Sequence, residues 1–291
     1  GPKWAVNATT GVHTHSVTVP GFSGSVARRL QVKTADLEVS TGTGDMNATR
    51  YFVEAQYVAA DDAAAGNKNN NASYRPVSVS GSGGAWDFAR IGATQREKPA
   101  IQAWRDIDAT VFLSNVTTQE ANGWDALVII GSQATDLGGG MWHYEFAVQN
   151  LNSDRSIRSV EVPIRPGATV TNIGFRDVDY HSGDGPGGVN CDGTDWPAVH
   201  SYDDLSWSTV THAQNIGGNA IRWGTMYNFR FDSDVPPWPG KGEVTLGYFK
   251  PATGAPDTVV GQGFTPMPCF RGDMNGDGLV DGQDIAIFVD R

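Results

Sequence analysis

Alternation of apolar and polar residues dominates the middle of the chain and predicts β-strands. The clearest runs are MWHYEFAVQNLN (141–152), AIRWGTMYNFRFDS (220–233) and EVTLGYFK (243–250), in which residues of one character recur at every second position. Turn signals such as Pro236-Pro237 separate these runs. Strands at this spacing are typical of an antiparallel sandwich rather than of strands that alternate with helices.

Further strand-like runs share this alternation: they are 28–40, 49–60, 77–80, 109–116, 125–136, 157–164, 169–180 and 204–212. The polar, Asn-rich stretch 61–75 is expected to be a surface loop. Between Trp86 and Asp108 the spacing changes, because Phe88, Ile91, Ile101 and Trp104 recur at roughly helical intervals around Pro99. This stretch predicts one or two short helices.

Together these elements predict a mainly β protein, an antiparallel immunoglobulin-like β-sandwich with one or two short helices and a single C-terminal calcium loop–helix. We expect four parts along the chain. A strand-like tail covers 1–20, and an irregular β lobe with short helices covers 21–124. The sandwich follows over 125–268, and the calcium loop with its short helix covers 269–291.

Composition narrows the class of protein. The 291 residues include 36 glycines, and only 18% are charged, which is typical of a turn-rich extracellular β protein. The formal net charge of -11 argues against nucleic acid or an anionic membrane as a partner, because both require a basic surface. No run of apolar residues is long enough to span a bilayer, so we expect no membrane insertion.

Near the end of the sequence, DMNGDGLVDGQD from Asp273 to Asp284 matches a calcium-binding loop. Such a loop needs oxygen ligands at positions 1, 3, 5, 7 and 12, a water-bridging residue at 9, and Gly at 6 for the turn. Gly278 occupies the turn position. The predicted Ca²⁺ ligands are Asp273, Asn275, Asp277, the Leu279 carbonyl, Asp281 through water, and Asp284. Because millimolar calcium is an extracellular resource, this loop also favours a secreted or cell-surface protein.

The calcium stretch resembles one repeat of a type I dockerin, which uses two such repeats to form a docking face. Here a single repeat is followed by Ile285, Ile287, Phe288 and Val289. One short helix cannot bury these side chains alone, so we expect the repeat to act as a calcium clip packed on the sandwich. A disulfide between Cys191 and Cys269, the only cysteines, is expected to help in an oxidising compartment, with two unpaired thiols as the alternative.

Two longer stretches, TDLGGGMWHYEFAVQNLNSDRSIRSVEVPIRPGATVTNIGFRDVDYHSGDG and NAIRWGTMYNFRFDSDVPP, carry a resemblance to a family. They look like an uncharacterised family of secreted bacterial proteins common in planctomycetes, whose members often end in a dockerin-type calcium repeat. The resemblance covers most of 28–291. It implies secretion and a β fold, and it implies no activity.

Each of the other candidate sites has two possible interpretations. Asp177, Asp179 and Asp184 share a Gly-rich loop that is either a second cation site or a solvated loop held by Asx turns and the disulfide. His13 and His15 lie at i and i+2 of a strand-like run, a geometry that zinc can use, although no third ligand is near in sequence. Five tryptophans could form a sugar-stacking platform or pack in the core: Trp142, Trp196, Trp207, Trp223 and Trp238.

The N-terminal tail raises the main functional hypothesis. Residues 3–19 read as a strand, with apolar Trp4, Val6, Val12, Val17 and Val19, and the flexible PGFSGS sequence follows at 20–25. The tail could complete a neighbouring sandwich as a donor strand, or fold back on its own. We therefore expect a non-enzymatic structural protein that assembles with copies of itself into an extracellular fibre, pilus-like structure or surface layer. The alternative is a carbohydrate-binding or dockerin-anchored module of a polysaccharide-degrading cell surface, with a surface glycan as its partner. No established catalytic motif is present, so an enzyme ranks third.

Overall fold

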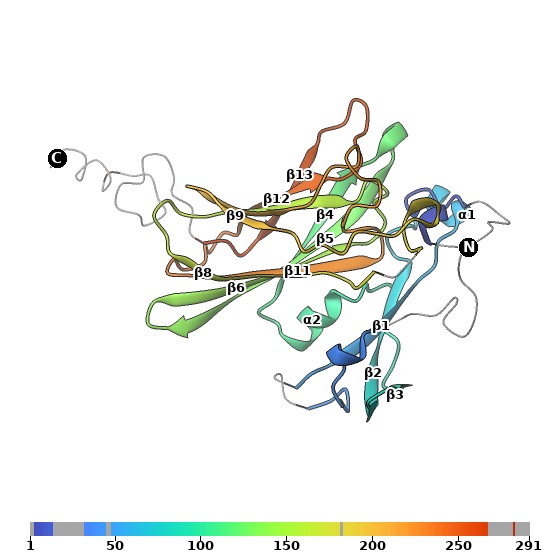
Figure 1. Ribbon diagram of the computed structural model, residues 1–291, viewed down its shortest axis with the longest axis horizontal. Coiled ribbons are helices and arrows are strands. Elements are labelled where there is room, and N and C mark those ends of the chain that lie inside the picture. The colour runs from blue at the N-terminus through green and yellow to red at the C-terminus, as the bar shows by residue number, and fades with distance from the viewer. Residues whose placement is uncertain (1–2, 14–31, 45–47, 181–182, 267–281, 283–291) are drawn as a thin grey trace.

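The computed structural model describes residues 3–13, 32–44, 48–180, 183–266 and 282. Within them the chain is mainly β, with three antiparallel sheets and two short α-helices, which confirms the predicted fold class. Two five-stranded sheets stack face to face, and a three-stranded sheet lies outside them beyond a short helix (Figure 1).

Each sheet of the sandwich mixes strands from distant parts of the sequence. The first has the order β4 (Phe112–Gln119), β5 (Asp125–Gly138), β6 (Met141–Asn150), β11 (Thr225–Ser233), β8 (Val170–Arg176). The second has the order β13 (Thr258–Gly263), β12 (Gly242–Tyr248), β7 (Ile157–Pro163), β10 (Asp204–Ser208), β9 (Ala198–His200). The chain crosses from one sheet to the other after β6, and again on both sides of β8 and of β11, so the two layers are interlocked.

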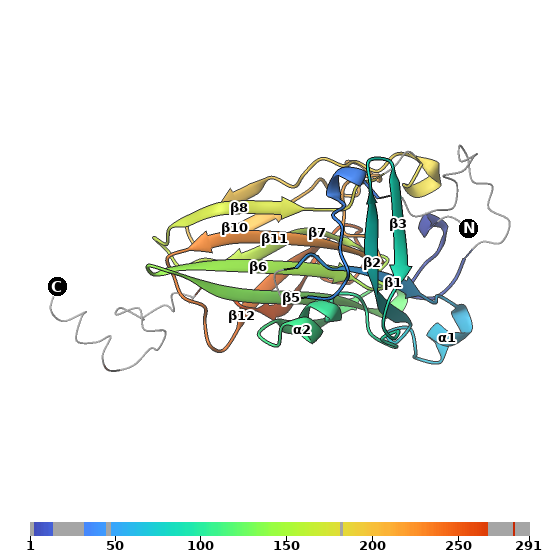
Figure 2. The ribbon, with the colours of Figure 1, turned by 90° about the horizontal axis from the view of Figure 1, so that it is seen from below.

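The remaining elements form a lobe beside the sandwich and several single turns. The third sheet has the order β1 (Tyr51–Gln56), β2 (Ala72–Ser82), β3 (Ala85–Arg90). The α-helices are α1 (Ala60–Ala64) and α2 (Gln102–Ile107), and the short 3₁₀ turns are η1 (Lys3–Ala5), η2 (Thr34–Asp36), η3 (Ala121–Gly123) and η4 (Pro186–Gly188). Seen from below, the lobe stands across the β5 and β6 face next to α2 (Figure 2).

Strand alternation places large aromatic side chains between the two five-stranded sheets. Tyr227, Phe229 and Phe231 of β11 are fully buried, while the intervening Arg230 is exposed. Phe231 stacks on Tyr144 of β6 with ring centroids 4.9 Å apart, and Trp207 of the opposite sheet packs on Phe229 at 5.3 Å. Each such side chain stabilises the fold by roughly 1.5–3 kcal/mol through burial.

One long side of the sandwich is closed by contact between its edge strands. The backbone N–H of Gln262 donates to Ser114 Oγ (3.1 Å), and that of Phe264 donates to Ser132 Oγ (2.9 Å). Gly261 allows this approach, because a Cβ there would lie 2.5 Å from Val116 Cγ2. β13 and β4 therefore protect each other, and β8 and β9 form the edges on the other side.

A buried polar contact fixes the lobe to the sandwich. Gln149 of β6 donates from Nε2 to Glu54 Oε2 of β1 (2.7 Å) and accepts from the backbone N–H of Ile101 (3.0 Å). Ile101 packs with Ile129 and Ala147 on the outer face of the first sheet. The α2 segment thus covers apolar residues that would otherwise face solvent.

Several local predictions were wrong. The stretch 86–108 was predicted to hold one or two short helices: α2 confirms one of them, but residues 86–90 form β3, since Trp86 and Phe88 pair across the sheet with Gly81 and Val79. The expected strand 28–40 consists, in its described part, of η2 and one bridge between Ser40 and Val79. The expected loop 61–75 contains most of α1 and the start of β2.

The predicted domain boundary at residue 125 also divides a single sheet. β4 pairs with β5 along its whole length, from Phe112 with Ser132 to Gln119 with Asp125. The sandwich therefore begins at β4, and the lobe comprises the elements before it. Only residues 108–111 (DATV) separate α2 from β4, so no Gly-, Pro- or Ser-rich linker marks this boundary in the sequence.

Candidate functional site

Residues 3–13 form a compact unit, here named the N-terminal plug, rather than the predicted strand. It begins with η1, and Val6 then forms a single antiparallel bridge with His13. Asn7 closes the turn between them: its Oδ1 accepts from Thr10 N (3.0 Å), and its N–H donates to Val12 O (2.9 Å). The Asn7 side chain here takes the place of a backbone acceptor, so Asn7 shapes the plug locally.

The tip of the plug is buried in the body of the protein. Ala8 and Thr9 are only 3% and 1% exposed. Thr9 Oγ1 donates to the backbone carbonyl of Asn152 (2.8 Å) and accepts from Asp154 N (3.3 Å). Gly11 has φ +71° and touches the Ala59 carbonyl so closely that a Cβ would lie 2.2 Å from it. The tip therefore fits one position only.

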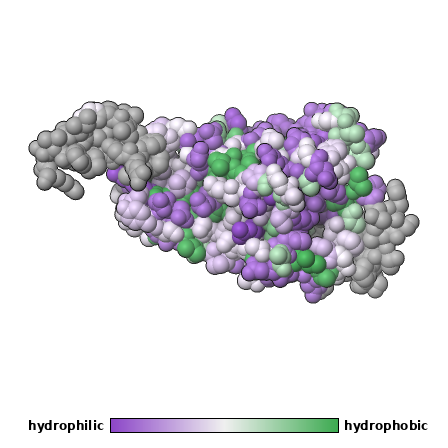
Figure 3. Space-filling model, turned by 90° about the horizontal axis from the view of Figure 1, so that it is seen from above, coloured by the Kyte–Doolittle hydropathy of each residue, from purple (hydrophilic) through white to green (hydrophobic). Residues whose placement is uncertain are grey.

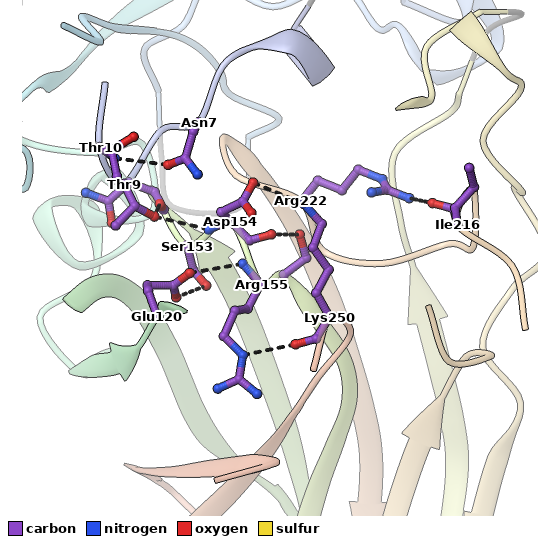
Figure 4. A network of polar contacts seen from close by, with 12 residues as sticks. Asn7, Thr9, Thr10, Glu120, Ser153, Asp154, Arg155, Ile216, Arg222 and Lys250 are labelled. Atoms are coloured by element: carbon purple, nitrogen blue, oxygen red, sulfur yellow. Dashed lines mark hydrogen bonds and ion pairs between the residues drawn. The ribbon is translucent and has the colours of Figure 1, made fainter. Parts of the chain in front are cut away.

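The β6–β7 connection, residues 151–156, forms the receiving site, which we name the socket (Figure 4). Its polar residues are buried because they satisfy one another. Asn150 Nδ2 donates to Ser153 O (2.9 Å), and Ser153 N donates back to Asn150 Oδ1 (2.8 Å). Asn152 Nδ2 donates to Lys68 O (3.0 Å), and its Oδ1 accepts from Leu127 N (2.7 Å). None of these bonds involves the plug.

Glu120 and Arg155 anchor the socket to neighbouring parts of the sandwich. The buried Glu120 carboxylate accepts from Thr118 Oγ1 (2.8 Å), Ser153 Oγ (2.6 Å) and Arg155 N (3.1 Å). The Arg155 guanidinium lies 3.6 Å from the centre of the Tyr248 ring and donates from Nε to Lys250 O (3.0 Å). The socket is therefore a preformed part of the sandwich.

The predicted donor-strand residues have mixed positions. Trp4 lies in η1, Val6 in the bridge, and Val12 is 59% exposed. Val17 and Val19 lie outside the described residues, as does His15 of the histidine pair. In the described part, the tail is a docked plug in which the small residues Ala8, Thr9 and Gly11 are buried, whereas the large apolar ones are not.

The three acids of the candidate second cation loop are not brought together. Asp177 accepts from Asn219 Nδ2 (2.6 Å), and burial raises the pKa of its carboxyl. Asp179 pairs instead with Lys33 (3.3 Å), and Asp184 is exposed. Among the described residues no group of three or more His, Cys, Asp or Glu side chains could hold a metal ion.

The predicted disulfide is not formed, because Cys191 is a free thiol. It lies beside Asp192, whose N–H donates to Gly217 O near the start of β11. Pro266 bridges Pro237 at the other end of the sandwich, beyond Gly242 and Gly263. The seven residues of β12 separate these ends by about 20 Å. Three residues from Pro266 to Cys269 reach at most about 11 Å, and bonded cysteines need Cα atoms within about 7 Å.

The calcium loop, Asp273 to Asp284, lies outside the described residues except for Gly282, as does Cys269. Its ligand set therefore stays a prediction from the sequence. The described chain leads into it from the Pro266 end of the sandwich.

The candidate tryptophan platform is mostly core. Trp196 and Trp207 are 2% and 0% exposed, and Trp142 packs against the same cluster. Trp223 is half-buried, with the Lys3 ammonium 5.0 Å from the centre of its ring. These four tryptophans therefore stabilise the sandwich or hold the plug, whereas Trp238 is half-buried, with its backbone N–H bonded to Thr265 O.

A cross-strand polar cluster was missed from the sequence. His143 of β6 lies directly opposite Asp232 of β11, with 2.6 Å between Nδ1 and Oδ1, and its Nε2 lies 3.4 Å from Glu145 Oε2. Burial raises the pKa of the Glu145 carboxyl, and the nearby His143 ring opposes the shift. Strand pairing between residues 89 positions apart creates this cluster, so no local signal could reveal it.

Comparison with known proteins adds no relative. No family model, no curated protein and no solved structure matches the chain. Within the described residues, no helix is long and apolar enough to cross a membrane. Any function must accordingly be argued from the plug, the socket and the residues around them.

Proposed function

We propose that this protein is a secreted, calcium-stabilised structural subunit that assembles with copies of itself at a bacterial surface or in an extracellular fibre. Assembly occurs when the N-terminal plug of one copy enters the socket of the next. The proposal is structural rather than catalytic, and it replaces strand donation by donation of a plug. The observation that carries it is the burial of Thr9 in a socket whose side chains are held by hydrogen bonds that do not involve the plug.

Geometry supports exchange of the plug between copies. The contacts of Ala8, Thr9 and Gly11 are the same whether the plug belongs to the same chain or to a neighbour, so exchange costs little contact energy. The chain from 14 to 31 separates the plug from the described body and contains the PGFSGS sequence. Eighteen residues can reach up to about 60 Å when extended.

The geometry of the contact between copies determines which assembly forms. A plug at one site and a socket at another form a heterologous contact, which propagates into a filament unless the rotation between copies closes a ring. The face shown in Figure 3 is mostly hydrophilic, with small and separate hydrophobic patches. This face therefore offers no broad apolar interface, and the docking of a small plug does not require one.

Electron microscopy and light scattering test the proposal on the full-length chain in calcium. We expect filaments or higher oligomers from the full-length protein and monomers from a chain that begins at Phe22. A full-length protein that stays monomeric, with the plug protected from proteolysis, would show that the plug docks only in its own chain.

A further inference from the structure

An open cleft lies between the plug and the socket, with a volume of about 500 Å³. Its walls combine apolar and polar side chains: Trp4, Val6, Val12, Asn7, His13 and Asp154. A cleft of this size matches small-ligand sites, in which mostly apolar walls carry a few oriented polar groups. The cleft does not depend on which copy supplies the plug.

The polar groups of the cleft are fixed in orientation. Asn7 Oδ1 is held by Thr10 N, so the amide nitrogen is left as a donor, and no described residue accepts from it. Figure 4 shows this nitrogen turned away from Thr10, toward the side on which Asp154 lies. Asp154 Oδ1 pairs with Lys250 Nζ (3.0 Å), which leaves Oδ2 as an acceptor with no described donor. The cleft thus offers a donor and an acceptor that the fold already positions.

Charge in the cleft favours a neutral ligand. Lys250 balances the carboxylate of Asp154, so a cation gains little there, and no metal-binding group exists among the described residues. An anion would meet Asp154 and the acidic chain as a whole, with its formal net charge of -11. A neutral ligand that both donates and accepts hydrogen bonds fits best.

From these contacts we infer that the cleft binds a neutral saccharide. The half-buried Trp4 indole supplies an apolar face for the C–H side of a sugar ring, and Val6 and Val12 extend that face. A sugar hydroxyl can accept from Asn7 Nδ2 and donate to Asp154 Oδ2. The subunit would then hold a neutral polysaccharide at the same end at which it receives the plug.

The experiment uses the full-length protein and an array of neutral glucose, galactose, mannose and N-acetylglucosamine oligosaccharides, with oligogalacturonate as the acidic comparison. Calorimetry on the best neutral oligosaccharide then compares three variants. Asn7→Asp keeps the acceptor for Thr10 but removes the donor, Trp4→Ala removes the apolar face, and Asn70→Asp makes the same chemical change at an exposed site.

We expect binding of a neutral oligosaccharide that Asn7→Asp weakens about tenfold, as loss of one hydrogen bond predicts, and that Trp4→Ala weakens at least as much. Asn70→Asp should bind as the wild type does, and the melting temperature of Asn7→Asp should match that of Asn70→Asp. Absence of neutral binding, tighter binding of oligogalacturonate, or wild-type affinity in Asn7→Asp would overturn the inference. Since calorimetry reads binding and microscopy reads assembly, each proposal can fail without the other.

Discussion

The hydroxyl of Thr9 donates a 2.8 Å hydrogen bond to the backbone carbonyl of Asn152, across 143 positions of sequence. This bond joins the extreme N-terminal part of the described chain to the turn between two central strands. The Thr9 hydroxyl also accepts a hydrogen bond from the backbone N–H of Asp154, so one buried hydroxyl satisfies two backbone groups of the socket. Whether this contact forms within one chain or between two copies decides whether the plug drives assembly.

Thr9→Val should loosen the plug while preserving its shape. The change leaves a buried carbonyl and a buried N–H without their partner, which costs about 1–3 kcal/mol. We expect faster hydrogen exchange and faster proteolysis within residues 3–13, with little change in the sandwich. Thr258→Val on the exposed surface of β13 is the matched control and should change neither rate. Equal protection of the plug in both variants would contradict the assigned role of Thr9.

Gly11→Ala should expel the plug by steric contact. A Cβ at this position would overlap the Ala59 carbonyl, whereas a Cβ at Gly66, with a similar φ of +84°, would meet nothing within 4 Å. Both substitutions carry a left-handed backbone cost of about 1–2 kcal/mol. Only Gly11→Ala should therefore expose the plug to protease and abolish higher oligomers. Retention of oligomers by Gly11→Ala would count against plug-driven assembly.

The sequence predicted the strands well wherever one face of a strand is buried. In β11 the alternation of Tyr227, Phe229 and Phe231 with polar residues reports directly on the core. The same reasoning failed for residues 86–90, because the spacing of Phe88 and Ile91 also fits a helix. Pairing with β2 decides between the two, and that contact is not visible from local spacing.

The site was harder to predict than the fold. Ala8 and Thr9 are small and partly polar, so nothing in their pattern indicates burial. The socket residues Asn150, Asn152 and Ser153 are buried because they bond to one another and to distant backbone groups. A hydropathy pattern assigns such residues to a solvated loop. Only the three-dimensional arrangement shows that the polar turn is part of the core.

Glu145→Gln tests the electrostatics of the cross-strand cluster. Burial raises the pKa of the Glu145 carboxyl above 4.5, so the folded protein holds this proton more tightly than the unfolded chain does. The resulting stability is complete below the unfolded pKa and is lost as the pH rises through the folded pKa. We expect the free energy of unfolding of the variant to increase relative to that of the wild type between pH 4 and 7.

Urea unfolding at several pH values measures this difference. Glu243→Gln, at an exposed position of β12, is the control and should show a smaller change with pH. A difference for Glu145→Gln that stays constant, or that moves in favour of the wild type as the pH rises, would show that the burial of Glu145 does not dominate its titration.

Removal of calcium should destabilise the protein through the C-terminal loop. Saturation at 100 times the dissociation constant stabilises a protein by about 2.7 kcal/mol, so EDTA should lower the melting temperature of the wild type. Asp277→Ala should have a low melting temperature without EDTA and should not respond to it. Asp257→Ala, an exposed acid outside the loop, should behave as the wild type does. If neither EDTA nor Asp277→Ala changes the melting temperature, the loop does not stabilise the fold.

Cross-linking between two differently tagged copies tests the central claim most directly. One copy carries Thr9→Cys and the other Asp154→Cys, both without Cys191 and Cys269, and the two are produced in the same cell. Because Thr9 contacts Asp154, mild oxidation can join these cysteines only where a plug occupies the socket of the other copy. The proposed assembly predicts a disulfide-linked dimer that carries both tags. Absence of that dimer, together with an internal disulfide in a chain that carries both cysteines, would contradict it.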